Sequence, residues 1–283
     1  MPVIRHTDPY AFLAAAQPML ARSEASAAFF RAFALGLKRH PPVADERVYC
    51  ATYCNGEQHG AAVQRADRGV VVEDSDPEAA AAFADDLARE WPGLQGVGGA
   101  LPACAAFAQR WHLRTGRGHV LRAHLRHHVL TEVALVPAVP GRMRCAMEDD
   151  LPWLADAAIE FLDDAKMPDD PARVRSDMPK FLNEGRFRIW DDAGPVAYAG
   201  WTDAGDAFAR VGPVYTSRPC RRRGYATGLV AQLSSELIAN GKRRIFLVTD
   251  LANPTSNAIY ARIGFRALTD FCHFDFVSAP AAE

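Results

Sequence analysis

The pattern of apolar positions along the second half of the chain alternates between helical and strand-like periods. Helical spacing predicts helices over 148–166, 171–185, 223–241 and 253–265, the second of them interrupted by Pro179. Alternating or short apolar runs predict strands over 142–147, 186–191, 194–202, 207–216, 243–251 and 266–277. Asp/Ala/Gly turns join the strands between 186 and 216, which indicates an antiparallel meander followed by a helical crossover. We expect the last strand, 266–277, to close the sheet of this half.

The first half repeats nearly the same order of elements. Its pattern predicts helices over 23–40, 76–91 and 100–116, and strands over 47–54, 60–66, 69–74, 93–99 and 118–130. Pro137, Pro140 and Gly141 interrupt the pattern between the halves. We therefore predict two domains, 1–140 and 141–283, that arose from a duplicated fold.

Composition narrows the class of protein. The 283 residues are 49% hydrophobic and 23% charged, which is typical of a globular protein with a sizeable core. The formal net charge of −2 gives no global attraction to nucleic acid or to an anionic membrane. The sequence shows neither a signal-peptide pattern nor the run of roughly 18 apolar residues that a membrane span needs. We expect a cytoplasmic monomer or homodimer with no membrane or nucleic-acid partner.

Cysteines and histidines give little support for a metal site. Cys50 and Cys54 share one face of a predicted strand, but no second pair at ligand spacing completes the set. The histidines between His119 and His128 fit the polar face of a strand. We expect reduced thiols and no metal.

The stretch PCRRRGYATGLV, residues 219–230, carries the strongest chemical signal. Three arginines stand directly before a predicted helix, whose N-terminus offers unpaired N–H groups and a partial positive charge. A bound polyanion would make the clustered arginines tolerable, whereas the alternative is an ordinary solvated basic surface. Nucleic-acid binding is a further alternative, and it would need a wider basic patch with aromatic residues.

This stretch resembles the pyrophosphate loop, Arg/Gln-x-x-Gly-x-Gly/Ala, of the GNAT superfamily of acyl-CoA-dependent N-acyltransferases. Arg221, Gly224 and Ala226 take its three constrained positions. Further along, NPTSNAIYARIGF resembles the family's Asn-to-Gly-Phe helix, matched by Asn253, Ser256, Tyr260, Gly264 and Phe265. The resemblance covers roughly residues 143–276. It implies an α/β fold of the α+β type, with a mixed, mostly antiparallel sheet flanked by helices, in two GNAT-like halves.

The resemblance also implies acetyl-CoA as cosubstrate and an amine, on a small molecule or a peptide, as acceptor. Main-chain N–H groups on the strand around 214–216 are expected to polarise the thioester carbonyl, and Tyr260 to protonate the leaving thiolate. The residues expected to bind the cofactor are Val214, Tyr215, Thr216, Arg221, Arg222, Arg223, Gly224, Tyr225, Ala226, Thr227, Asn253 and Asn257.

The general base and the acceptor site are less well marked. Glu160 and Asp164 lie on the helix that borders the acceptor pocket in this family, and we take them as acceptor-site candidates. The alternatives are a solvated helix face and deprotonation of the amine through water.

The corresponding stretch of the first half lacks the loop. Its helix begins at Asp76-Pro77 with Glu73, Asp74 and Glu78 nearby, an acidic start that would repel a pyrophosphate. We therefore expect a degenerate N-terminal half without a CoA site and an acetyl-CoA-dependent N-acetyltransferase in the second half. The alternative is an acetyl-CoA-binding sensor or interaction module that has lost catalysis.

Overall fold

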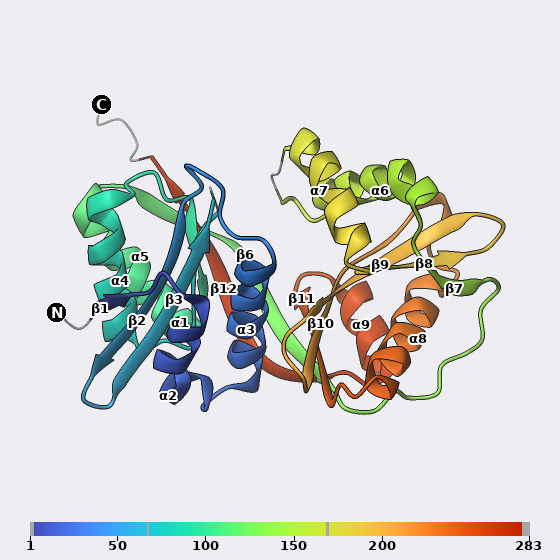
Figure 1. The fold of residues 1–283 in the computed structure, drawn as a ribbon, viewed down its shortest axis with the longest axis horizontal. Helices are drawn as coiled ribbons and strands as arrows, with labels where there is room; N and C mark the ends of the chain where they lie inside the picture. Colours follow the sequence, from blue (N-terminus) through green and yellow to red (C-terminus); the bar gives the residue numbers. More distant parts are fainter. Residues whose placement is uncertain (1–2, 67, 168–169, 279–283) are drawn as a thin grey trace. The chain divides into compact units, whose positions relative to one another are not determined.

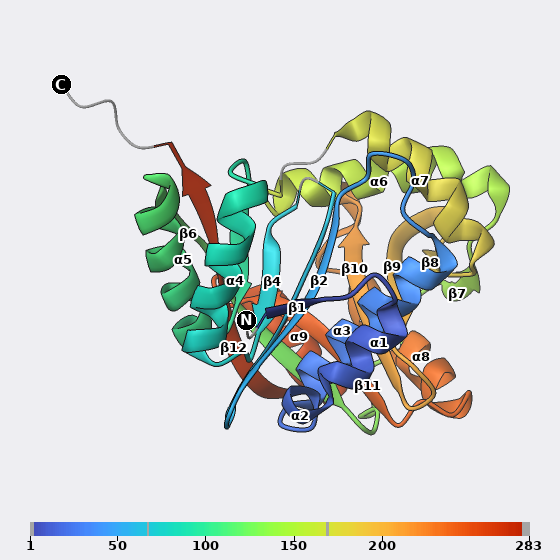
Figure 2. The same cartoon turned by 60° about the vertical axis from the view of Figure 1, so that its left-hand side comes forward.

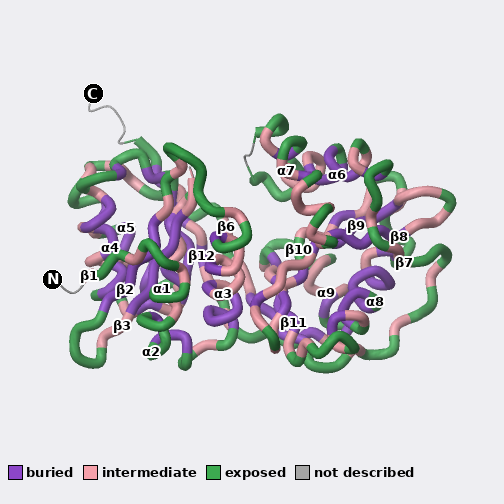
Figure 3. The backbone as a smooth tube through the Cα atoms, viewed as in Figure 1, coloured by how far each residue is buried: buried purple, intermediate pink, exposed green. Residues whose placement is uncertain are grey.

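The computed structural model describes residues 3–66, 68–167 and 170–278, which form two compact units. Unit 1 comprises residues 1–127, 249–252 and 268–283, and unit 2 comprises residues 128–248 and 253–267. Buried residues concentrate in the strands and on the inner sides of the helices of each unit (Figure 3).

Unit 1 is a mixed sheet with helices on both faces. Its elements are β1 (Val3–Arg5), α1 (Pro9–Ala15), α2 (Gln17–Leu20), α3 (Glu24–Arg39), β2 (Val48–Asn55), β3 (Gln58–Arg65), β4 (Val70–Glu73), α4 (Pro77–Glu90), β5 (Gly96–Gly99) and α5 (Leu101–Thr115). Strands β1 to β4 are antiparallel neighbours, and β4 pairs in parallel with β5 across the connecting helix α4. Helices α4 and α5 cover one face of this sheet, and α1 to α3 cover the other (Figures 1 and 2).

Unit 2 repeats this plan. After β6 (Gly118–Leu130), which begins in unit 1, come β7 (Arg142–Cys145), the short 3₁₀ turn η1 (Glu148–Asp150), α6 (Leu151–Asp164), α7 (Pro171–Asn183), β8 (Phe187–Asp191), β9 (Pro195–Asp203), β10 (Phe208–Thr216), the 3₁₀ turn η2 (Arg218–Cys220), α8 (Tyr225–Ala239), β11 (Arg244–Asp250) and α9 (Pro254–Ile263). Strands β7 to β10 are antiparallel, and β10 pairs in parallel with β11 across α8. Helices α8 and α9 pack on one face, and α6 and α7 pack on the other.

The predicted mixed, mostly antiparallel sheet flanked by helices is thus confirmed. The parallel pair joined by a helix occurs once in each unit, as β4–α4–β5 and as β10–α8–β11. The duplicated order of elements therefore corresponds to a duplicated topology.

The last strand, β12 (Arg266–Val277), does not close the sheet of the second half as we expected. Residues Cys272–Asp275 instead pair antiparallel with β5 of unit 1. The glycines of β5 allow this close approach, because a Cβ at Gly96 would lie 2.2 Å from the Phe274 carbonyl oxygen. Phe276 also stacks on Trp111 of α5, with the ring centroids 5.1 Å apart. Alternation identified the strand correctly, but it carries no information about the pairing partner.

Candidate functional site

The loop between β10 and α8 has the local geometry of an open helix N-terminus. It passes through η2, extends at Arg221, and takes positive φ angles at Arg222 (64°) and Gly224 (87°). Gly224 is the N-cap of α8, and no side chain caps the helix there. The first N–H groups of α8 therefore need another partner, which an anion supplies well.

Gly224 is required for packing as well as for backbone conformation. A Cβ at this position would lie 2.7 Å from Cγ1 of Val139, and one at Gly228 would lie 2.7 Å from Cγ2 of the same residue. The segment that follows β6 thus lies against the first turn of α8. Sequence reasoning missed this role of Val139, because the contact joins residues far apart in the chain.

Gly224→Ala is expected to lower the free energy of unfolding by about 2 kcal/mol, since it combines a strained φ with overpacking against Val139. Gly241→Ala is the matched control, because Gly241 follows the other end of α8 at φ +92° and an added Cβ there would have nothing within 4 Å. Urea unfolding of both variants measures the difference. Equal losses would show that Val139 adds nothing beyond the backbone strain.

The strands β10 and β11 part before β10 ends. Their parallel pairing joins Phe208–Arg210 to Arg244–Phe246, whereas β10 continues to Thr216. A bulge between Val211 and Val214 interrupts the β9 pairing, which then resumes for Val214–Thr216. The end of β10 therefore has one edge paired with β9 and one edge open towards β11.

Register identifies which N–H groups face the open edge. Ser217 donates its N–H to the Val196 carbonyl of β9, and Tyr215 lies opposite Tyr198. Because N–H groups alternate between the two edges of a strand, those of Val214 and Thr216 face away from β9. The Thr216 carbonyl is on that open edge too, since it accepts from Nε of Arg221 at 3.1 Å.

The two acidic candidates on α6 have different partners. Glu160 accepts a hydrogen bond of 2.5 Å from the Tyr215 hydroxyl. Asp164 accepts from Nη2 of Arg221 and, at 3.0 Å, from Arg218. The hydrogen bond from Arg221 lowers the pKa of Asp164, so this carboxylate is a poor proton acceptor near neutral pH. Asp164 is therefore suited to holding Arg221, whose guanidinium lies 5.2 Å from the Tyr215 ring centroid.

The aromatic residues beneath α6 include an unsatisfied buried hydroxyl. Tyr198 is fully buried, with its ring centroid 6.4 Å from that of Tyr215, and its hydroxyl has no hydrogen-bond partner in the described part of the chain. Burial raises the pKa of Tyr215 to about 12, and the hydrogen bond to Glu160 adds to this effect. Both phenols therefore keep their protons at neutral pH.

Tyr260 lies in the core beneath α8. It is 9% exposed, packs edge-on against Phe265 at 5.9 Å, and belongs to the same apolar cluster as Tyr225 and Val214. Burial raises its pKa to about 12, so the phenol carries its proton at neutral pH, as a general acid requires.

Two of the remaining candidates, Asn253 and Tyr225, have structural partners. The side-chain oxygen of Asn253 caps α9 by accepting the Ser256 N–H at 3.0 Å. The hydroxyl of Tyr225 donates to Asp192, a contact that sequence reasoning missed because Asp192 falls in a predicted turn far from α8 in the chain. Ala226 is half-buried, Thr227 is buried, and Asn257 is half-buried on α9, whereas Arg222 and Arg223 are exposed beside the helix N-terminus.

The corresponding place in unit 1 is closed. Pairing of β4 with β5 continues to Glu73 and Gly99, and the Ala100 N–H donates to the Glu73 carbonyl at 2.9 Å. At the start of α4, Asp76 accepts the His59 N–H at 2.6 Å, and Glu78 accepts from the Tyr53 hydroxyl. Among its described residues, unit 1 therefore has neither the parted strands nor the basic loop of unit 2.

Two other kinds of site find no support in the described residues. Within residues 3–66, 68–167 and 170–278, no group of three or more His, Cys, Asp or Glu side chains is arranged so that it could hold a metal ion. Among the helices formed by those same residues, none is long and apolar enough to cross a membrane.

Comparison with known proteins identifies the fold. Residues 191–274 match the model of the FR47-like protein family. A GCN5-related N-acetyltransferase from Sphaerobacter thermophilus is similar with a TM-score of 0.66 and 15% identity, over 99% of this chain and 97% of that one. A Drosophila protein gives 0.67 and 16% identity, over 98% and 99% of the two chains. A tandem GNAT protein from the clavulanic acid biosynthesis pathway gives 0.54 and 15% identity, over 90% and 89%.

These likenesses confirm the GNAT fold and the resemblance that the two motifs predicted. The FR47-like segment spans β8's last residue to β12, and so contains the basic loop, the parted strands and Tyr260. A comparison with curated proteins gave no match.

Proposed function

We propose that unit 2 transfers the acetyl group of acetyl-CoA to a primary amine. The observation that carries the proposal is the parting of β10 from β11 directly before an uncapped, arginine-flanked helix N-terminus. The open strand edge fits an extended pantetheine arm, and the N–H groups of the first α8 turn fit a pyrophosphate. Likeness to GNAT acetyltransferases supports the same assignment.

Each group at this site has a defined task in the transfer. Loop residues 222–227 hold the cofactor, and the Val214 N–H on the open edge donates to the thioester carbonyl oxygen as negative charge develops there. The ammonium first loses a proton to water or a carboxylate. The neutral amine then forms the new C–N bond while the C–S bond breaks, and the nitrogen releases its second proton to solvent to give the amide. Tyr260 gives its proton to the departing sulfur and regains one from solvent.

The acceptor side is proposed to lie at Tyr215 and Glu160, beneath α6. Glu160 supplies negative charge for a cationic amine, and the unsatisfied Tyr198 hydroxyl marks a buried place where a polar group lacks its partner among the described residues. Asp164 is assigned to holding Arg221 rather than to proton removal, because its pKa is lowered by that ion pair. Small amines and peptide amines both fit this description.

The N-terminal half, residues 1–140, is proposed to bind no CoA. Strand β4 stays paired with β5 up to Glu73 and Gly99, so no open strand edge lies between the described residues of these two strands. The start of α4 presents Asp76 and Glu78 rather than arginines. The C-terminal half, 141–283, is proposed to supply the catalytic residues.

The test is thermal unfolding with and without acetyl-CoA, followed by free-thiol release with a panel of amines. At a hundredfold excess over the dissociation constant, binding to the native state adds about 2.7 kcal/mol of stability. We expect a clear rise in Tm and thiol release with at least one cationic amine. A rise without thiol release for any amine would favour the sensor, and no rise would refute the proposal.

A further inference from the structure

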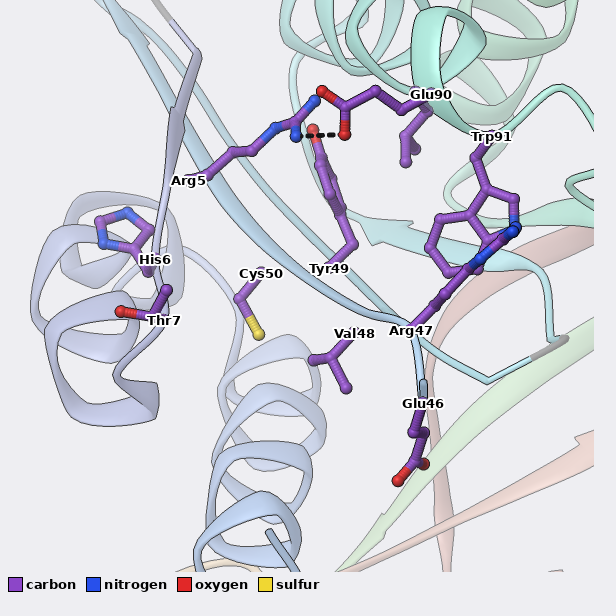
Figure 4. A pocket seen from close by; sticks show the side chains of 11 residues that line it. Arg5, His6, Thr7, Glu46, Arg47, Val48, Tyr49, Cys50, Glu90 and Trp91 are labelled. Carbon is purple, nitrogen blue, oxygen red and sulfur yellow. Dashed lines mark hydrogen bonds and ion pairs between the residues drawn. The ribbon is translucent and has the colours of Figure 1, made fainter. Parts of the chain in front are cut away.

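A groove of about 460 Å³ lies in unit 1, whereas the β10–α8 loop belongs to unit 2. The groove is lined by the turn between β1 and α1, the beginning of β2 and the C-terminal end of α4 (Figure 4). Residues of both sheet faces line it: Tyr49 and Trp91 from the α4 side, and Val48 and Cys50 from the side of α3. A groove bordered by both faces follows the edge of a strand.

The main chain of Val48 faces this groove. His6 donates its N–H to the Cys50 carbonyl, so Cys50 directs its main-chain groups to β1, and by alternation Val48 does the same. The other edge of β2 confirms this alternation. The Ala66 N–H, next to β3, donates to the Arg47 carbonyl, so the main-chain groups of Arg47 face β3 and those of Val48 face the opposite edge. Strand β1 ends at Arg5 and the chain turns into α1, so β1 does not reach Val48. Within the described residues, no hydrogen bond to the Val48 N–H or carbonyl is found.

The charges at the groove are unequally satisfied. Arg5 has two carboxylate partners, Asp86 at 2.8 Å and Glu90 at 2.6 Å. Arg47 lies with its guanidinium 5.1 Å from the Trp91 ring centroid, and no carboxylate partner for it is found among the described residues. Stacking on an aromatic ring uses the face of a guanidinium and leaves the N–H donors in its plane available to a carboxylate.

We propose that this groove binds an extended peptide that bears a carboxylate, by strand addition to β2 at Val48 with the carboxylate on Arg47. An unpaired strand edge supplies main-chain hydrogen bonds to any extended peptide, and side-chain contacts at alternate positions supply selectivity. In this groove, successive side chains of the peptide would contact Trp91 and Tyr49 on one face of the sheet and Val48 and Cys50 on the other. The acidic group is selected because Arg47 is the groove's cation without a carboxylate among the described residues. This site is independent of the proposed acetyl transfer.

The probe is the blocked tetrapeptide acetyl-Ala-Val-Ala-Asp-amide, titrated into the full chain while backbone amide signals are followed by NMR. We expect the Val48 amide to shift downfield, and its titration to give the dissociation constant. Replacing the aspartate of the peptide with asparagine, or Arg47→Gln in the protein, should each weaken binding by about tenfold, the loss of one charge-assisted hydrogen-bonded pair. Arg110→Gln, on α5 and outside the groove, is the control and should leave the affinity unchanged.

Two further changes test the main-chain contact. Val48→Pro removes the outward N–H while keeping the β2–β3 hydrogen bonds, which residue 48 does not make, and should abolish binding. A peptide N-methylated at its Val and second Ala amides leaves the protein untouched and should bind as poorly. The proposal is overturned if the Val48 amide does not shift, if the methylated peptide binds normally, or if free acetate produces the same shifts as the peptide.

Discussion

Acetyl-CoA is expected to lose about a hundredfold in affinity when Arg222 and Arg223 are both changed to glutamate. Both side chains are exposed beside the uncapped start of α8. Each charge-assisted hydrogen bond to a phosphate contributes about 1.5 kcal/mol or more, so losing two removes about 3 kcal/mol. Arg221 is left unchanged in this experiment, because its ion pair with Asp164 holds the loop against α6.

The matched control is the pair Arg243→Glu and Arg262→Glu. It makes the same change in net charge at two exposed positions, one just beyond the other end of α8 and one in the last turn of α9. Fifteen residues of α8 separate Arg243 from the loop by about 22 Å, beyond the reach of screened charges at physiological salt. Isothermal titration with acetyl-CoA distinguishes the two variants. An equal loss in both would mean that net charge, and not this loop, governs the affinity.

Tyr260→Phe is expected to lower kcat by about a hundredfold or more while leaving the KM for acetyl-CoA nearly unchanged. A positioned general acid contributes typically 10²- to 10⁴-fold. Its effect falls on kcat because the phenol meets the sulfur only as the thiolate departs. The ring keeps its place, since Phe retains the edge-on contact with Phe265.

A comparison of rate with stability separates this role from a purely structural one. Burial raises the pKa of Tyr260 to about 12, so the acid stays protonated in the wild type throughout the neutral range. The Phe variant should therefore lose rate without losing stability beyond about 1 kcal/mol. A variant with full kcat would show that the thiolate leaves unassisted or is protonated by water, and Tyr260 would then be a core residue only.

Much of the fold was predictable because its signals are local. The helix expected over 223–241 is α8, and the strands expected from 186 to 216 are β8, β9 and β10. Pro254 and Gly264 marked the ends of α9 as predicted, since proline fits a first helical turn and glycine a left-handed end. The GNAT resemblance was also local, because the loop motif lies within a few residues.

What the sequence left open depends on contacts between distant positions. The Glu160–Tyr215 hydrogen bond joins residues 55 positions apart, and the Asp164–Arg221 ion pair joins residues 57 apart. No periodicity reveals such pairs, so both carboxylates looked alike in the sequence. The partner of β12 was mispredicted for the same reason, because it is set by glycines at 96 and 98 that lie far earlier in the chain.

The pairing of β12 with β5 has a consequence for how the molecule can be made and divided. The first 127 residues emerge from the ribosome long before Cys272 is synthesised. Until β12 has been made, the edge of β5 and the faces of Phe107 and Trp111 that contact Phe276 stay uncovered. Cutting the chain at the sequence midpoint would leave the N-terminal fragment one strand short. A fragment cut there therefore exposes the edge of β5, and in the full chain that edge is open to non-native pairing until β12 has been synthesised.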